Sequence, residues 1–421
     1  MKSRSVKLMH RVYSSNHVLD SPLLMFSTIV VLFTIADAII AYSVPIYIES
    51  TYHSTTIMGF LMAISSTAGI VFDFWAGKKF SKTSYKIFLS ITIALSAMVA
   101  ATMHFVAPSL ALIVAVLIIW GVYFETAAFA NFNFIHKFMN IKQHNHAWGV
   151  VFSAKSLAYL AGPLITVALV TSGTGSPMLT ALGLIIASFL VFVLFKKKFD
   201  KHKKINTYVP EEQKSFAQEL KVWRVLGKHV WPLWIFNFFL ILVDSSFWTV
   251  GIIFAERLRV IEPVGGLFLT AYMIPQVVVG VFLVRVLPPE GKKKTAFTAA
   301  IVAGVLLHLM AYMTSVTIIL FTVLGASIFY AIAIAELLAV YEDYVARLGI
   351  HGNDLIGLQR TSESLAYILG PIALGYTVSV IGFSDTFSAV GTLLGIVAVV
   401  AMVVVPKKLR MPQKELLELN K

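Results

Sequence analysis

Long apolar runs separated by short polar breaks make up most of the 421-residue chain. A helix needs about 20 apolar residues to cross the hydrocarbon core of a membrane. Twelve runs reach this length approximately, which predicts membrane helices over residues 23–48, 55–75, 84–106, 109–134, 148–171, 178–195, 232–254, 264–287, 295–314, 317–342, 355–380 and 385–405. The pattern therefore predicts an all-α integral membrane protein with twelve transmembrane helices.

The polar breaks form two alternating groups that differ in charge. One group contains most of the Lys and Arg: the N-terminal tail, GKKFSK, HKFMNIKQ, KKKFDKHKK, EGKKKT and the tail KKLRMPQK. The other group, ESTYHST, HFVAPS, TSGTGSP and IGFSD, has neither, and the exceptions on that side are Arg257 and Arg259. Loops rich in Lys and Arg stay in the cytoplasm. We therefore expect a multi-pass protein of the cell membrane with both termini cytoplasmic and a retained first helix rather than a signal peptide.

Composition supports the membrane assignment and excludes several kinds of function. The chain is 58% hydrophobic and 13% charged, unlike a soluble domain. Its net charge of +13 is concentrated in the loops of one side, so we expect contact with anionic lipid and no nucleic-acid partner. The absence of cysteine excludes disulfides and thiolate metal sites. We find no HExxH, GxGxxG or P-loop pattern and no nucleophile–base set. We therefore expect a protein that binds no metal or cofactor and is not an enzyme.

One phrase occurs twice. SLAYLAGPLI begins at Ser156 and SLAYILGPIA begins at Ser364, 208 residues later, with six of ten positions identical. The same offset relates Lys155 to Glu363 and Tyr159 to Tyr367. Offsets close to it relate two pairs of acids, Asp37 to Asp244 and Glu125 to Glu336. Both copies of the phrase contain a Gly-Pro pair, Gly162-Pro163 and Gly370-Pro371. Six helices in each half give the halves the same orientation, as in a parallel repeat around an axis along the membrane normal.

The repeat predicts the domain organisation. We expect an N-terminal six-helix bundle over 1–195, a cytoplasmic linker over 196–231, a C-terminal six-helix bundle over 232–406 and a cytoplasmic tail over 407–421. Within the linker, FAQELKVWRVL is typical of an amphipathic helix on the membrane surface. The small residues and Gly-Pro pairs of the phrase let helices approach closely and bend, either at a moving interface or in ordinary tight packing.

These features together resemble the major facilitator superfamily of secondary transporters. After the second helix, GIVFDFWAGKK is similar to the signature of this family between helices 2 and 3, and five residues match it in type: Gly69, Asp73, Gly77, Lys78 and Lys79. The copy departs from the signature at Phe74, where a basic residue is usual, and has one extra residue before Gly77. The resemblance implies a conformational lock at this loop.

A second motif of the same family suggests a subclass. Gly162-Pro163 of the fifth helix is similar to the signature of drug and metabolite exporters, with Ala158 where a further glycine is common. The resemblance implies that the protein is an exporter. It also implies that helices 1 and 7 line a central cavity.

Two aspartates lie near the centres of the first and seventh helices. Charged residues inside a membrane are costly and usually face a bundle interior or a wet cavity. Asn237, Asp244 and Trp248 share one helix face, because they are spaced by seven and four residues. Asp37 and Asp244 are therefore candidates for a proton or cation site or for contacts to a substrate. The alternative is a local role, in which each caps a kinked helix or hydrogen-bonds to a neighbour.

Other charges lie nearer the cytoplasmic end. Glu125 and Lys155 are at similar depth in the fourth and fifth helices, which predicts an ion pair that either serves transport or is a static structural pair. In the second half Glu336, Arg360 and Glu363 bring two acids and one base to comparable depth, so one acid without a strong partner is a candidate proton carrier. The family resemblance also implies an Asp73–Arg360 bridge that closes the cytoplasmic side, and the alternative for Arg360 is a snorkelling side chain.

The sequence as a whole predicts a monomeric carrier that rocks one bundle against the other, driven by protons or another coupling ion. The predicted cavity region holds five acids and two bases, which favours a cationic or neutral polar small-molecule substrate, with export preferred over uptake. Two alternatives stay open. One is a proton-coupled sugar or metabolite importer, and the other is a transport-inactive sensor or assembly factor.

Overall fold

The computed structural model describes residues 22–79, 83–107, 109–139, 144–199, 216–282, 291–406 and 412–418. Within these ranges every regular element is a helix. Eleven helices are long and apolar enough to cross a membrane, and a shorter apolar helix spans Pro263–Val279. The predicted all-α membrane fold is therefore confirmed. Helices suit this environment because they satisfy their own backbone hydrogen bonds where lipid offers no partners.

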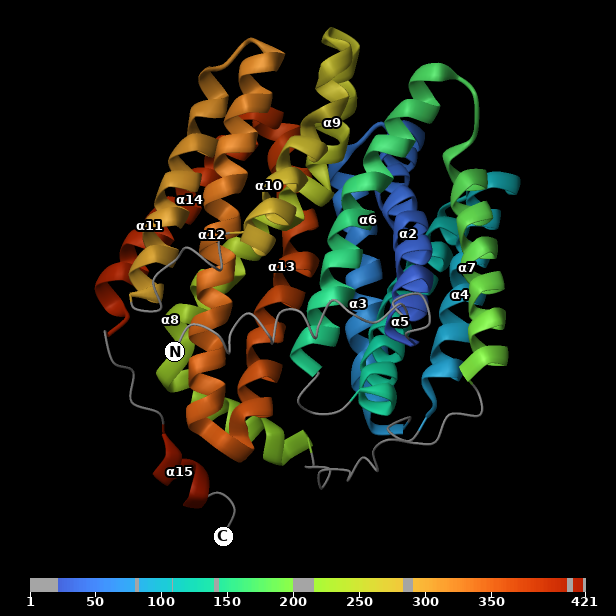
Figure 1. Cartoon of the computed structure of the whole chain (residues 1–421). Coiled ribbons are helices and arrows are strands. Elements are labelled where there is room, and N and C mark those ends of the chain that lie inside the picture. Colours follow the sequence, from blue (N-terminus) through green and yellow to red (C-terminus); the bar gives the residue numbers. More distant parts are fainter. Residues whose placement is uncertain are drawn as a thin grey trace, which may run out of the picture.

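The helices form two bundles that stand side by side (Figure 1). The N-terminal bundle contains α2 (Pro22–Tyr52), α3 (Thr55–Lys79), α4 (Tyr85–Phe105), α5 (Leu110–Phe138), α6 (His144–Ser172) and α7 (Pro177–Phe199). The side-chain oxygens of Ser84 and Ser109 cap α4 and α5 by accepting from Lys86 N and Leu112 N. Stacked aromatic rings fill the interior of this bundle, with the Phe26 and Phe134 centroids 3.7 Å apart.

The C-terminal bundle has the same plan with more interruptions. Its elements are α8 (Phe216–Trp248), α9 (Val250–Ile261), η3 (Pro263–Leu267), α10 (Phe268–Phe282), α11 (Lys292–His308), η5 (Leu309–Tyr312), α12 (Val316–Leu348), η6 (Gly349–His351), α13 (Gly352–Ile381) and α14 (Phe383–Val404). A short helix, α15 (Gln413–Glu418), follows at one end of the molecule. Gly382, in the left-handed region at φ 85°, makes the tight turn between α13 and α14.

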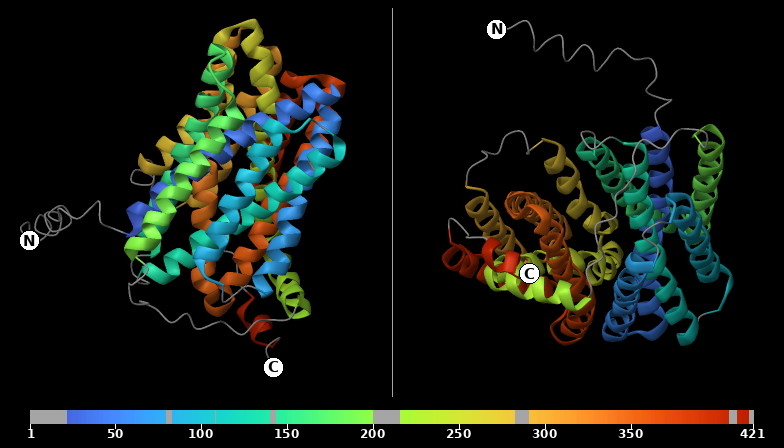
Figure 2. Two further views of the ribbon diagram at one scale, coloured as in Figure 1. Left: turned by 90° about the vertical axis from the view of Figure 1, so that its right-hand side faces the viewer. Right: turned by 90° about the horizontal axis from the view of Figure 1, so that it is seen from below.

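The seventh membrane helix begins earlier than the sequence pattern suggests. The amphipathic stretch and the membrane span form one helix, α8, with Pro232 inside it. Seen from below, the first part of α8 runs across the end of the C-terminal bundle (Figure 2). There the Trp223 ring packs on Gly357 of α13, where an added Cβ would lie 3.2 Å from the ring. The amphipathic stretch is thus anchored to its own bundle.

The two bundles are in close contact at the end away from α15. The Thr55 hydroxyl of α3 donates to the Gly375 carbonyl oxygen of α13 (2.9 Å), and the Thr56 hydroxyl donates to Ser379 Oγ (3.1 Å). Gly59 is part of this interface, because a Cβ there would lie 2.0 Å from the Pro371 carbonyl oxygen. Here α3 and α13 approach backbone to backbone, which no larger residue at position 59 would allow.

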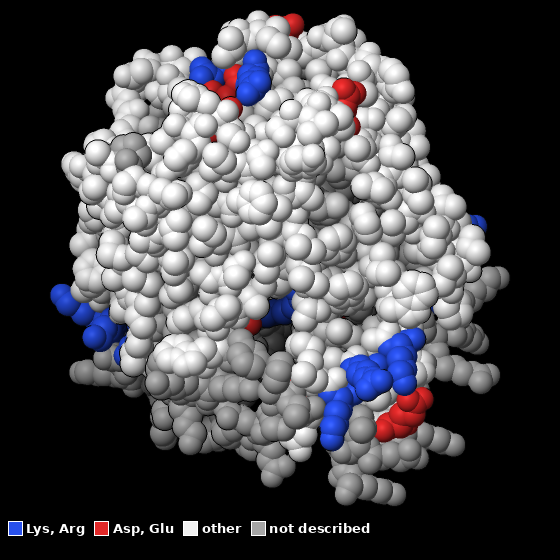
Figure 3. All heavy atoms as spheres, turned by 180° about the vertical axis from the view of Figure 1, so that it is seen from behind, with Lys and Arg blue, Asp and Glu red and all other residues white. Residues whose placement is uncertain are grey.

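The opposite end is open. Figure 3 shows a recess between the bundles in the lower part of the molecule, with acidic and basic atoms inside it. Among the described residues, every hydrogen bond or ion pair that joins the bundles lies on the closed side. Among the described residues, the hydrogen bonds and ion pairs between the bundles therefore lie at one end, and the recess lies toward the other, which the charge pattern assigns to the cytoplasm.

Candidate functional site

Asp37 lies near the middle of α2 and is 3% exposed. Its Oδ1 accepts hydrogen bonds from the Tyr123 hydroxyl (2.7 Å) and from Trp120 Nε1 (3.1 Å), both on α5. Its Oδ2 accepts from the Tyr159 hydroxyl of α6 (2.8 Å). Three aromatic donors thus surround this carboxylate and take the place of water.

Asp244 occupies the equivalent place on α8 but has fewer donors. The Tyr272 hydroxyl of α10 donates to its Oδ1 (2.6 Å), and the Tyr367 hydroxyl of α13 donates to its Oδ2. Asp244 is half-buried, as is Tyr367. The residue as a whole is therefore less enclosed than Asp37.

The repeated phrase creates both contacts. Gly162 lets α6 approach α2 directly beside Asp37, because an added Cβ would lie 2.4 Å from the Ala38 Cβ. Gly370 does the same for α13 and α8, where an added Cβ would lie 2.7 Å from the Ser245 Oγ. In each copy the tyrosine three residues before the glycine then reaches the aspartate.

The two clusters meet at the interface between the bundles. The rings of Tyr159 and Trp248 are in edge contact, with their centroids 5.4 Å apart and their planes at 72°. Trp248 lies one turn along α8 from Asp244, and Tyr159 donates to Asp37. This pair of rings therefore places the tyrosine that donates to Asp37 against a residue one helical turn from Asp244, across the bundle interface.

Sequence reasoning identified the aspartates but not the residues that surround them. Tyr159 and Tyr367 are in the matched phrase, four positions after the Lys155/Glu363 exchange, so the repeat already contained a signal for them. No sequence pattern distinguishes Trp120, Tyr123 and Tyr272 from the other aromatic residues of the chain. Their role depends on how α5 and α10 are rotated, which only packing decides.

The predicted ion pair between Glu125 and Lys155 is absent from the structure. The Glu125 carboxyl lies against α3, where a Cβ on Gly69 would come 3.5 Å from its Oε1. Lys155 Nζ lies 5.8 Å from the Phe124 ring centroid and within electrostatic range of Asp37 as well as Glu125. Equal depth along two helices did not ensure that the side chains point toward each other.

The acids of the second half are separated. Glu363 accepts from Gln359 Nε2 (2.6 Å) and lies within electrostatic range of Arg360. Glu336 is 7% exposed, and its Oε2 has no hydrogen-bond partner in the described part of the chain. The basic residue that acts on it electrostatically is Lys292 of α11. Glu336 and Glu363 therefore have different surroundings, and of the two it is Glu336 that has a buried carboxyl oxygen without a hydrogen-bond partner in the described part of the chain.

Asn237 is also not grouped with Asp244. It is fully buried and donates to the Ser362 hydroxyl (2.6 Å), which ties α8 to α13 inside the C-terminal bundle.

The loop motif is described in part. Asp73 and Arg360 are both exposed, and they form no ion pair with each other. The bridge was expected for a state that is closed at the end which the charge pattern assigns to the cytoplasm, and the recess lies toward that end. Helix α3 reaches Lys79, but the side chains of Gly77, Lys78 and Lys79 lie outside the described residues.

Arg257 and Arg259, the exceptions in the charge pattern, lie at the closed end. Arg259 donates twice to Glu256 Oε2 (2.6 and 2.9 Å), and the Tyr42 hydroxyl of α2 donates to Glu256 Oε1 (3.2 Å). Arg257 pairs with Glu49 of α2 (3.2 Å). These residues hold α9 against α2 across the bundle interface, which gives the two bases a structural reason to be on this side.

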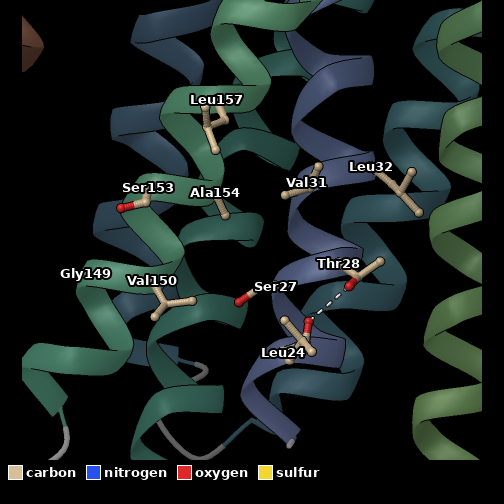
Figure 4. Close-up of a pocket in the computed structure, with 10 residues that line it drawn as sticks. All are labelled: Leu24, Ser27, Thr28, Val31, Leu32, Gly149, Val150, Ser153, Ala154 and Leu157. Carbon is tan, nitrogen blue, oxygen red and sulfur yellow. Dashed lines mark hydrogen bonds between the residues drawn. The ribbon is translucent and has the colours of Figure 1, made fainter. Parts of the chain in front are cut away.

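A groove of about 690 Å³ lies apart from the carboxylates, between α2 and α6 (Figure 4). Its lining is mostly apolar and includes Val31, Val150 and Leu157. It contains none of the predicted site residues. Among the described residues no group of three or more His, Asp or Glu could hold a metal ion.

Comparisons with known proteins agree with this architecture. The model of the Major Facilitator Superfamily matches residues 24–350. A POT family transporter solved with 5-aminolevulinic acid is 11% identical, with a TM-score of 0.69 over 91% of this chain and 96% of that one. A bacterial homologue of the human lysosomal transporter Spinster, in an inward-facing conformation, is 14% identical, with a TM-score of 0.65 over 93% and 96%.

The human organic anion transporter MFSD10 is 13% identical, with a TM-score of 0.62 over 90% of this chain and 98% of that one. A search of curated proteins found no significant match. At these identities the solved structures support the fold, and the family model covers more than three quarters of the sequence. The chain therefore belongs to the Major Facilitator Superfamily of secondary transporters.

Proposed function

We propose that this protein exports a small organic molecule in exchange for protons by alternating access. The observation that carries the proposal is the pair of repeat-related carboxylates, Asp37 and Asp244, each held inside the membrane by a tyrosine of the matched phrase. The side chains of Tyr159 and Trp248 bring the two clusters together at the interface between the bundles, which are in contact at one end and have a recess between them toward the other. A substrate entering at the open end could reach the carboxylates without crossing lipid.

Proton coupling is supported by the lack of fixed counter-charges. Among the described residues, no Lys, Arg or His forms an ion pair with either aspartate. An ionised carboxylate inside the membrane is costly unless a cation or a proton neutralises it. Exchange of a bound proton for a substrate group would couple the two flows.

The direction of transport rests on the Gly162-Pro163 pair, which resembles the signature of exporters. Its geometry gives that resemblance a physical basis, because Gly162 places α6 beside Asp37. Pro163 leaves the Tyr159 carbonyl without its usual helical partner, since proline has no backbone N–H. A bend at this point would move the Tyr159 ring relative to Trp248 and so link the site to motion of the bundles.

Reconstituted vesicles with a pH-sensitive dye inside test the proposal. Small amines, sugars and carboxylates are presented one class at a time, and compound uptake and internal pH are recorded together. We expect accumulation of one class in acid-loaded vesicles with a matching loss of internal protons. Asp244→Asn should abolish the linked proton flow, whereas Asp343→Asn, an exposed acid paired with Lys292, should not. Accumulation that needs no proton gradient, or none by wild-type protein for any class, would contradict proton-coupled export.

A further inference from the structure

The two aspartates differ in how well their charge is compensated. Asp37 receives three hydrogen bonds, one of them from Trp120 Nε1, which can only donate, and Lys155 lies within electrostatic range. Asp244 receives two hydrogen bonds, both from tyrosine hydroxyls, which accept as readily as they donate. Asp37 is thus the better compensated of the two carboxylates, and Asp244 is the one arranged to take a cation from outside.

The surroundings of Asp244 determine what kind of cation fits. Asp244, Trp248, Tyr159 and Tyr367 are all half-buried. Tyr367 donates to Asp244, and the Trp248 ring contacts Tyr159 across the bundle interface, so one carboxylate and three aromatic side chains are brought together there. Aromatic faces attract cations through their quadrupole, and they also bury apolar substituents. Small inorganic ions prefer oxygen ligands and gain little from such walls.

We infer that Asp244, Trp248, Tyr159 and Tyr367 form a binding site for an organic ammonium ion, which is the substrate class of this carrier. The carboxylate of Asp244 neutralises the charge, and the rings of Trp248 and Tyr159 enclose the alkyl or methyl groups on the nitrogen. Tyr159 contributes from the N-terminal bundle and the others contribute from the C-terminal bundle. A bound ammonium ion therefore touches both bundles, and its departure frees them to move apart.

This inference rests on the proposed transport function but is tested by binding. The full-length protein is purified in detergent and titrated calorimetrically with tetramethylammonium, choline and benzyltrimethylammonium. The neutral control is 3,3-dimethylbutan-1-ol, which has the shape of choline with carbon in place of nitrogen. We expect at least one cation to bind and the neutral alcohol to bind about tenfold more weakly or not at all.

Variants then locate the site. Asp244→Asn and Trp248→Leu should each weaken binding by about tenfold or more, and Trp248→Phe should retain most of the affinity because it keeps an aromatic face. Asp37→Asn should cause a smaller loss than Asp244→Asn, and Asp343→Asn should cause none. Thermal unfolding of each variant without ligand identifies any that fails to fold, in which case the comparison of choline with its neutral isostere decides.

The outcomes separate this inference from the transport proposal. If none of the cations binds, if the alcohol binds as well as choline, or if Asp37→Asn is the more damaging change, the inference is wrong. Cation binding at Asp244 without linked proton movement in vesicles would support the inference and contradict proton coupling. Proton-coupled flux of a neutral compound without cation binding would support proton coupling and contradict the inference.

Discussion

The clusters around Asp37 and Asp244 come from equivalent positions of a repeat, yet they differ in access and in donors. Both contain a tyrosine from the matched phrase and a glycine that allows close helix contact. Asp37 is enclosed by Tyr123 and Trp120 of α5, whereas Asp244 has Tyr272 of α10 and remains half-buried. The repeat thus preserved the way an aspartate is held, and the second copy left its aspartate accessible.

The largest expected difference concerns loss of the carboxylates. Asp37→Ala leaves three donors without an acceptor, two of them buried, and should destabilise the protein by about 3 kcal/mol or more. Asp244→Ala should cost about 1–2 kcal/mol, because it leaves two donors, of which only that of Tyr272 is buried. Unfolding by sodium dodecyl sulfate measures both, with Asp343→Asn as an exposed control. Equal losses would show that the two sites are enclosed to the same degree.

The second largest difference is expected between alanine substitutions at Gly162 and Gly370, the two glycines of the matched phrase. Gly162→Ala places a Cβ against the Ala38 Cβ and the α2 backbone, neither of which can move aside, at a cost of about 2 kcal/mol. Gly370→Ala meets the Ser245 side chain, which can rotate because its Oγ has no hydrogen-bond partner in the described chain, so the cost should stay below about 1 kcal/mol. The same unfolding assay ranks them. A reversed order would mean that α8 and α13 are packed more rigidly than α2 and α6.

Hydrogen-bond coupling should distinguish a charged from a neutral carboxyl. A double-mutant cycle of Tyr159→Phe with Asp37→Asn should give a coupling free energy of about 1.5 kcal/mol, as for a hydrogen bond to a charged group. The cycle of Tyr367→Phe with Asp244→Asn should give about 0.5 kcal/mol without substrate, because a proton then neutralises Asp244. Similar values for both cycles would contradict different charge states for the two aspartates.

The smallest effect is expected from substitutions at the closed end, where contacts between the bundles determine from which side Asp244 is reached. Arg257 is exposed in its pair with Glu49, so Arg257→Gln should shift the balance between conformations by less than about 1 kcal/mol. The chain has no cysteine, so spin labels at Ser50→Cys and Val260→Cys report the distance between α2 and α9 without background. In Arg257→Gln we expect a slightly larger fraction of molecules with a long distance between the two labels. Arg259→Gln, which removes two bonds to Glu256, should cause a larger shift. Unchanged distances in both variants would show that these pairs do not hold the closed end.

Predictions from the sequence succeeded where they depended on position along a single helix. Eleven of the twelve predicted spans and the two aspartates at mid-membrane were visible in one dimension, and the matched phrase contained the two tyrosines without indicating their role. The Glu125–Lys155 pair required knowledge of how two helices are rotated, and that prediction was wrong for this structure. Glu336 shows the same limit, because the basic residue that acts on it electrostatically is Lys292 of α11.

The sequence by itself determined the apolar spans and the existence of two related acidic positions, and it predicted the orientation of the loops. It did so because hydrophobicity and charge act locally against the bilayer, and because a repeat is preserved in residue order. Tertiary structure decided which aromatic residues surround each aspartate, which of the two stays accessible and which end of the carrier is closed. Those properties follow from helix rotation and close contacts at glycines, which arise only when distant segments pack together.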